Sequence, residues 1–146
     1  MANASDVIDS RQTPAVTLLN DHTHWVLRLA LASVFGFHGL QKLPALEPMS
    51  QMLGFSEGVI LLVALAEIAT AVFIIAGGLF GDWLTRLGAL LGMPVILGAI
   101  AFYHWPRWSF TPADGFPMGG MEFQVTLLFL LIYFLARKIE SQGPSS

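Results

Sequence analysis

Four long apolar segments dominate this 146-residue sequence and leave few folds open to it. They cover residues 25–43, 58–80, 86–105 and 122–140. A helix needs about 20 mostly apolar residues to cross the hydrocarbon core of a bilayer, and each segment is close to that length. Charged residues make up only 12% of the chain, about half of their usual share in a soluble domain. We therefore predict an all-α polytopic membrane protein, a bundle of four transmembrane helices.

The two ends of the chain are polar and are expected to stay outside the membrane. Residues 1–24 contain acidic side chains and Pro14, and no basic stretch precedes a short apolar core. They are predicted to be a flexible tail rather than a cleavable signal peptide. Residues 141–146 are predicted to be a disordered tail. The membrane domain then covers residues 25–140, and the connections at 44–57 and 106–121 are expected to be loops.

Basic residues near the helix ends predict the orientation. The side that holds the termini has Arg11, Arg28, Arg86, Arg137 and Lys138, and the opposite side has Lys42 and Arg107. Lys and Arg are enriched in the cytoplasmic segments of membrane proteins. We therefore predict that both termini lie in the cytoplasm and that the two longer loops face outward.

Several classes of function lack support in the sequence. The chain has no cysteine, which excludes disulfides, thiol redox relays and zinc–thiolate sites. Its net charge of −3 and the lack of a basic run give no electrostatic basis for binding nucleic acid. We find no phosphate-binding glycine loop, no catalytic triad order and no motif for a metal, haem or flavin. The sequence holds no self-contained catalytic motif.

Ionisable residues inside the apolar segments are the candidate functional residues, because a charge within a bilayer is costly. With a rise of 1.5 Å per residue, His38 lies roughly 6 Å and Glu67 roughly 3 Å from the bilayer centre, on the same side of it. The same estimate places Lys42 and Glu122 together at about 12 Å, with Gln41 and His104 close to that level.

The first segment carries its polar residues on one face. His38, Gln41 and Lys42 have the spacing i, i+3, i+4, and Arg28 lies within about 40° of Lys42 around the helix. We call Arg28, His38, Gln41 and Lys42 the polar stripe. The stripe is expected to face the bundle interior, toward Glu67 of the second segment and Glu122 of the fourth.

Each of these residues also has a structural interpretation. Lys42, His104 and Glu122 lie near helix ends, from which their side chains could extend to water. Arg28 could be a basic anchor at the cytoplasmic surface. Glu67 is nine residues from the nearer end of its segment, so it is either a functional group or a neutral, hydrogen-bonded packing residue. A pair of His38 and Glu67 could exchange protons or could be static.

The segment from Arg28 to Leu43, RLALASVFGFHGLQKL, resembles the opening helix of the DoxX family. The shared pattern is an Arg, a glycine, His-Gly and then Lys-Leu. Glu67, the Gly77-Gly78-Leu79 exit of the second segment and Glu122 are similar to later features of the family. The resemblance implies a four-helix bundle in the bacterial cytoplasmic membrane. It also implies a link to quinone-connected electron transfer, or a membrane platform for soluble redox proteins.

The leading hypothesis is an accessory or quinone-contacting subunit of a membrane oxidoreductase system. His38 and Glu67 would exchange protons, and Lys42 and Glu122 would set the local charge. Arg28, Gln41 and His104 complete the candidate ligand-binding residues. Its partners would be the lipid bilayer, a larger redox protein and further copies of the chain. One alternative is a non-enzymatic scaffold or assembly factor, and another is a small permease.

Overall fold

The computed structural model describes residues 14–137, with side chains from residue 22 onward, and within this range it is all-helical. The helices are α2 (Pro14–Lys42), η1 (Leu43–Ala45), α3 (Leu46–Leu53), α4 (Glu57–Phe80), α5 (Asp82–Ala99), η2 (Ile100–His104) and α6 (Glu122–Ala136). Helix η2 is a π-helix that continues α5, and η1 is a short 3-10 helix. The predicted tails at 1–13 and 141–146, and the predicted end of the last segment at 138–140, lie outside the described residues.

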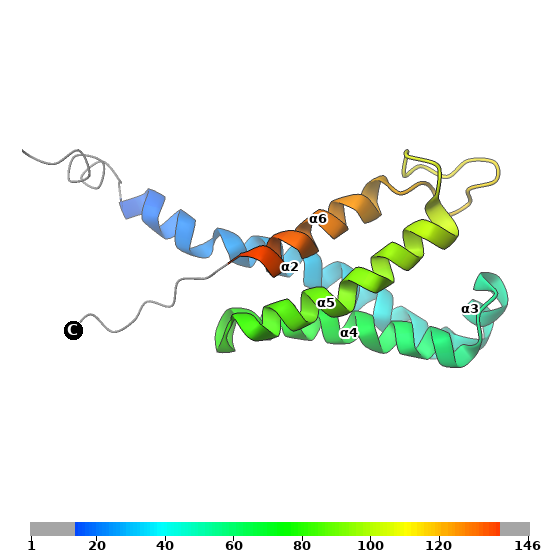
Figure 1. The fold of residues 1–146 in the computed structure, drawn as a ribbon, viewed down its shortest axis with the longest axis horizontal. Coiled ribbons are helices and arrows are strands. Elements are labelled where there is room, and N and C mark those ends of the chain that lie inside the picture. The colour runs from blue at the N-terminus through cyan, green and yellow to red at the C-terminus, as the bar shows by residue number, and fades with distance from the viewer. Residues whose placement is uncertain (1–13, 138–146) are drawn as a thin grey trace, which may run out of the picture.

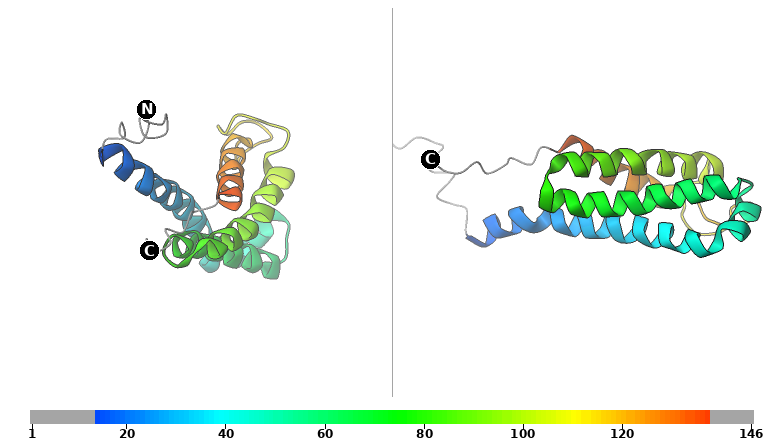
Figure 2. Two further views of the ribbon diagram at one scale, coloured as in Figure 1. Left: turned by 60° about the vertical axis from the view of Figure 1, so that its left-hand side comes forward. Right: turned by 90° about the horizontal axis from the view of Figure 1, so that it is seen from below.

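The four long helices run alternately in opposite directions, with α2 beside α4, α4 beside α5 and α5 beside α6 (Figure 1). The Gly81 end of the bundle holds the connection between α4 and α5 and the described ends of the chain. The loop end holds α3 and residues 105–121. Helices α2 and α6 approach each other toward the Gly81 end, where Arg28 lies near Phe134, and they diverge toward the loop end (Figures 1 and 2). The bundle is therefore closed at one end and splayed at the other.

Two helices, Glu57–Phe80 and Asp82–His104, are long and apolar enough to cross a membrane. Helix α6 is apolar but shorter, with 15 described residues. Helix α2 has ample length at 29 residues, but the polar stripe lowers its hydropathy. By length and composition, the described residues thus contain two of the four predicted spans.

Three predicted boundaries differ from the structure. Helix α2 begins at Pro14, so residues 14–24 continue the first helix instead of forming a flexible tail. The expected loop at 44–57 contains α3. Pro48 is compatible with this helix because it lies in the first turn of α3, where a missing N–H removes no hydrogen bond within the helix. Gly54 ends α3 with φ 74°, a left-handed conformation that favours glycine. The gap at 81–85 between the second and third predicted segments is reduced to Gly81, since α5 begins at Asp82.

Apolar side chains from all four long helices form the core at the Gly81 end and middle of the bundle. The buried cluster comprises Leu31, Phe35, Ile74, Ala89, Ile96, Leu127, Leu131 and Phe134. Two glycines of the third segment contribute to it, because Gly88 and Gly92 pack against α4, near the backbone of Ile74 and the Thr70 methyl. Those two glycines serve packing within the chain.

Helices α2 and α4 approach each other closely at Gly39. A Cβ added there would lie 2.8 Å from the Ala64 carbonyl oxygen and 2.8 Å from Ile68 Cγ1. Small residues permit this close approach of helix backbones in membrane proteins. The contact lies one turn from Lys42 and therefore sets how near the end of α2 comes to α4.

We predict that Gly39→Ala destabilises the protein by about 1–3 kcal/mol, the usual cost of overpacking a close contact. Gly98→Ala is the matched control, because a Cβ at this glycine within α5 meets no atom within 4 Å. Thermal unfolding of the full chain in detergent measures both. Equal melting temperatures for the two variants would contradict the close α2–α4 contact.

Candidate ligand-binding site

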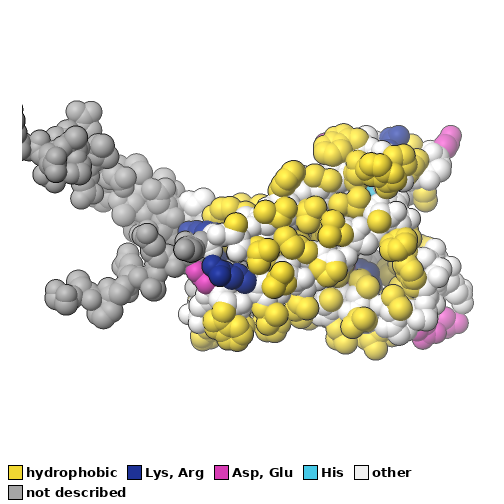
Figure 3. Space-filling view, in the orientation of Figure 1, with side chains coloured by type: hydrophobic (Ala, Val, Ile, Leu, Met, Phe, Trp, Pro, Cys, Tyr) yellow, Lys and Arg dark blue, Asp and Glu magenta, His cyan; other side chains and the backbone are white. Residues whose placement is uncertain are grey.

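A cavity of about 730 Å³ opens where the helices diverge toward the loop end. Its walls come from α2, α4, α5 with η2, and α6, and α3 and Met118 cover it. Figure 3 shows a hollow on this face, with a basic side chain and a histidine visible among apolar ones. The volume lies within the range of 300–1,000 Å³ that is typical of small-molecule sites.

An ion pair between α2 and α4 forms one polar wall. Lys42 Nζ lies 2.7 Å from Glu67 Oε2 and 3.0 Å from Oε1, and it donates a third hydrogen bond, of 3.2 Å, to the His38 carbonyl oxygen. The side chains are 13% and 9% exposed. An ammonium group has three N–H bonds, so Lys42 is fully satisfied by the protein. The carboxylate keeps lone pairs that no described donor uses.

Glu67 therefore pairs with Lys42, whereas the depth estimate suggested His38 as its partner. His38 lies four residues before Lys42 on α2 and lines the same cavity. Its ring is exposed and packs edge-on against Phe37, with 5.6 Å between the ring centroids. Within residues 14–137, no hydrogen bond to the His38 ring is present. Gln41 is also exposed and lies at the rim of the cavity.

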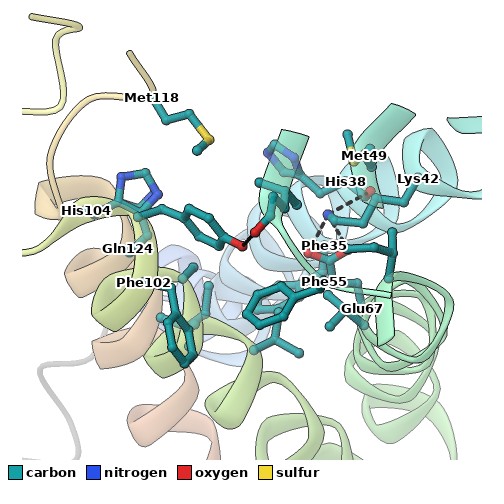
Figure 4. Close-up of a pocket in the computed structure, with 18 of the residues that line it drawn as sticks. Phe35, His38, Lys42, Met49, Phe55, Glu67, Phe102, His104, Met118 and Gln124 are labelled. Carbon is teal, nitrogen blue, oxygen red and sulfur yellow. Dashed lines mark hydrogen bonds and ion pairs between the residues drawn. The ribbon is translucent and has the colours of Figure 1, made fainter. Parts of the chain in front are cut away.

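The opposite wall is a hydrogen-bonded chain through the buried side chain of His104, the last residue of η2. Its Nδ1 lies 2.9 Å from the Gly119 carbonyl oxygen, and its Nε2 lies 2.9 Å from Gln124 Nε2 (Figure 4). A carbonyl only accepts, so Nδ1 carries the proton, and Nε2 of the neutral ring accepts from the Gln124 amide. Both ring nitrogens are thereby occupied, and His104 anchors the loop to the cavity wall.

Gln124 Oε1 is buried and has no hydrogen-bond partner within the described residues. An unsatisfied buried carbonyl costs about 1–3 kcal/mol. The sequence does not single out Gln124, because a glutamine in the first turn of an apolar helix carries no signal of its own. Only the contact with His104 reveals it.

Aromatic residues join the two walls at the loop end. Tyr103 donates a hydrogen bond of 2.9 Å from its hydroxyl to the Leu53 carbonyl oxygen at the end of α3. The Phe55 ring packs edge-on against Phe102 at 5.4 Å between centroids and against Tyr103 at 6.3 Å. These contacts hold α3 against η2. Sequence analysis also missed Tyr103 as a cavity residue.

The two remaining candidates do not line the cavity. Arg28 is fully buried near the Gly81 end, where Nη1 donates to the Ile74 carbonyl and, over 2.8 Å, to Thr85 Oγ1. Its guanidinium lies 5.0 Å from the centre of the Phe134 ring. Arg28 thus connects the helices and faces away from lipid. Glu122 accepts a hydrogen bond of 3.3 Å from the Phe110 N–H, which ties the loop to the start of α6.

The polar stripe of α2 therefore faces the other helices at both of its ends. Arg28 reaches α4 and α5, and Lys42 reaches α4. Between them, His38 and Gln41 open onto the cavity. The described residues contain no cluster of three side chains arranged to hold a metal ion.

An all-helical chain with membrane-length helices and an internal cavity belongs to the broad class of small helical membrane proteins. The profile of the DoxX family matches residues 24–105, more than half of the chain, so this protein belongs to the DoxX family, which is a membrane family. The match includes the Lys42–Glu67 wall and His104 but ends before Gln124. No curated protein and no solved structure matches the sequence.

We predict that Lys42→Met destabilises the protein by about 3–5 kcal/mol, because it leaves the Glu67 carboxylate buried without a partner. The double variant Lys42→Met/Glu67→Leu should recover most of that loss, since no buried charge then remains. Equilibrium unfolding in detergent micelles measures both variants and the single variant Glu67→Leu. A double variant as unstable as the sum of its single variants would show that the two side chains are not coupled.

Proposed function

We propose that this DoxX-family protein is a quinone-contacting accessory subunit of a membrane oxidoreductase system, and that the cavity at the loop end holds the quinone head. The observation that carries the proposal is the composition of this cavity. Its walls are mostly apolar, and a few polar groups converge on it from two sides. That arrangement suits a planar apolar ring with two polar atoms at opposite positions.

Exposed apolar side chains around the cavity support a ligand that arrives from the bilayer. Met52 is 62% exposed, Phe102 68% and Phe123 45%, and all three also line the cavity. Exposed apolar surface of this kind is stable in hydrocarbon but costly in water. A lipophilic molecule could enter here without crossing a polar barrier, and its tail could extend into the lipid.

The polar groups give the cavity proton chemistry. His38 has a ring without a hydrogen bond to the described residues, and Glu67 has lone pairs that Lys42 does not use. Both can exchange protons with a ring oxygen, and Lys42 compensates the charge of Glu67. Neither His38 nor Glu67 stores electrons, so the redox step requires a larger redox protein as the partner.

The proposal includes four membrane spans, with both termini in the cytoplasm. Large apolar side chains are exposed on all four long helices, among them Leu29 on α2, Leu62 on α4, Leu90 on α5 and Phe129 on α6. Lipid would cover such side chains. The alternating helix directions and the excess of basic residues on the side of the termini support the orientation in a bacterial cytoplasmic membrane.

A cavity-filling variant tests the proposal without breaking the polar network. Gly98 lines the cavity, and a Cβ at this position meets no atom within 4 Å, so Gly98→Phe should fold and occupy the space. We expect decylubiquinone to bind the purified wild-type protein in nanodiscs. The variant should weaken this binding by at least about tenfold, the equivalent of 1.4 kcal/mol.

Leu97→Phe is the matched control, because Leu97 is 52% exposed and does not line the cavity. Its affinity should equal that of the wild type. Absence of quinone binding by the wild type, or equal binding by Gly98→Phe, would overturn the proposal. A bundle that folds normally and binds no quinone would instead fit a scaffold, in which the Lys42–Glu67 pair serves only helix register.

A further inference from the structure

The unused hydrogen-bonding capacity of the cavity consists mainly of acceptors. We infer from the Lys42–Glu67, Tyr103–Leu53 and His104–Gln124 contacts that the site is built for a hydrogen-bond-donating ligand, a hydroquinone in preference to the corresponding quinone. The inference rests on the proposed function and specifies which redox form of the ligand the protein holds.

The ion-pair wall offers the ligand an acceptor. All three N–H bonds of Lys42 are used, two by the oxygens of Glu67 and one by the His38 carbonyl oxygen. Lys42 therefore has no proton left for a ligand oxygen. A carboxylate has about four lone-pair sites, and Lys42 occupies only two of those on Glu67. The free capacity at this wall is the carboxylate.

The opposite wall also offers an acceptor. The Gly119 carbonyl fixes the proton of His104 on Nδ1, and this in turn fixes the Gln124 amide with its N–H toward Nε2 of the neutral ring. The orientation leaves Gln124 Oε1 as the buried atom without a partner, in a residue that lines the cavity. Figure 4 shows His104 and Gln124 facing Lys42 and Glu67 across the cavity.

Tyr103 follows the same pattern between the two walls. Its hydroxyl proton is donated to the Leu53 carbonyl, so only the oxygen lone pairs remain for a ligand. Three groups can still donate: His38 and Gln41, which are exposed at the rim, and the second N–H of the Gln124 amide. A ligand oxygen inside the cavity therefore meets mainly acceptors, and one at the rim meets donors and acceptors.

The oxidised and reduced forms of a quinone differ in their ability to donate hydrogen bonds. A quinone carries two carbonyl oxygens, which only accept, so the oxygen inside the cavity would face other acceptors and lose its hydrogen bonds to water. A hydroquinone carries two O–H groups. One can donate to Glu67 and the other to Tyr103, or to Gln124 Oε1 after a small shift of the Gln124 side chain that opens this buried atom to the cavity. Burial of unmatched polar atoms is what rejects the oxidised form.

The test compares three ligands of the same ring and tail on the full-length protein in nanodiscs under anaerobic conditions. These are decylubiquinol, decylubiquinone and the quinol methylated on both hydroxyls, which has no donor. We expect the quinol to bind at least about tenfold more tightly than either of the others, since one net hydrogen bond is worth about a factor of ten. The methylated quinol should behave like the quinone.

Two variants test whether Gln124 contributes to the preference for the quinol over the quinone. Gln124→Leu removes one acceptor and should reduce the ratio of quinol to quinone affinity several-fold, whereas Thr126→Val, on the exposed face of the same helix, should leave the ratio unchanged. Equal affinity of the wild type for quinol and quinone would overturn this inference and leave the proposed quinone contact intact. Failure of the wild type to bind any of the three ligands would overturn both.

Discussion

The ion pair between Lys42 and Glu67 is the interaction on which the arrangement of the loop end depends. A carboxylate in an apolar bundle needs a counter-charge, and the close approach of α2 and α4 at Gly39 brings Lys42 to it. With Lys42 committed to α4, the last turns of α2 present His38 and Gln41 to the space between the helices. The same pair keeps that space electrically neutral, so it can be lined by apolar side chains and accept an uncharged lipophilic ligand.

Two anchors of different kinds hold the bundle open at one end and closed at the other. At the Gly81 end, Arg28 is buried against a carbonyl of α4, Thr85 of α5 and the Phe134 ring of α6, and this draws the helices together. At the loop end, His104 attaches the loop to η2 and Tyr103 attaches α3. These contacts form around the cavity instead of filling it, which leaves a stable void between them.

The sequence predicted the level of the candidate site better than its pairings. Helical rise places His38 and Glu67 at one level and Gln41, Lys42 and His104 at a second level farther from the bilayer centre, and all five line the cavity. Depth does not specify the direction in which a side chain points, so Glu67 was given the wrong neighbour and Glu122 was grouped with Lys42. Gln124 and Tyr103 act through single contacts to distant residues, which no pattern in the sequence displays.

The boundaries of the helices show a related limit. Hydropathy finds the apolar part of a helix, so the polar first turns of α2 were assigned to a tail. Prolines after an apolar segment favour a loop, but Pro48 lies within the first turn of α3. Helix α3 matters for the site because it covers the cavity.

Photoaffinity labelling most directly tests the claim that the cavity is a binding site for a quinone-type molecule. An azidoquinone would be irradiated with the full-length protein in nanodiscs and the modified peptides mapped by mass spectrometry. We expect labels to concentrate on cavity residues of α2 and α3, such as His38, Met49 and Met52, and excess decylubiquinol to prevent this labelling. Labels spread over lipid-facing residues such as Leu62 and Leu90, and unaffected by competitor, would contradict it.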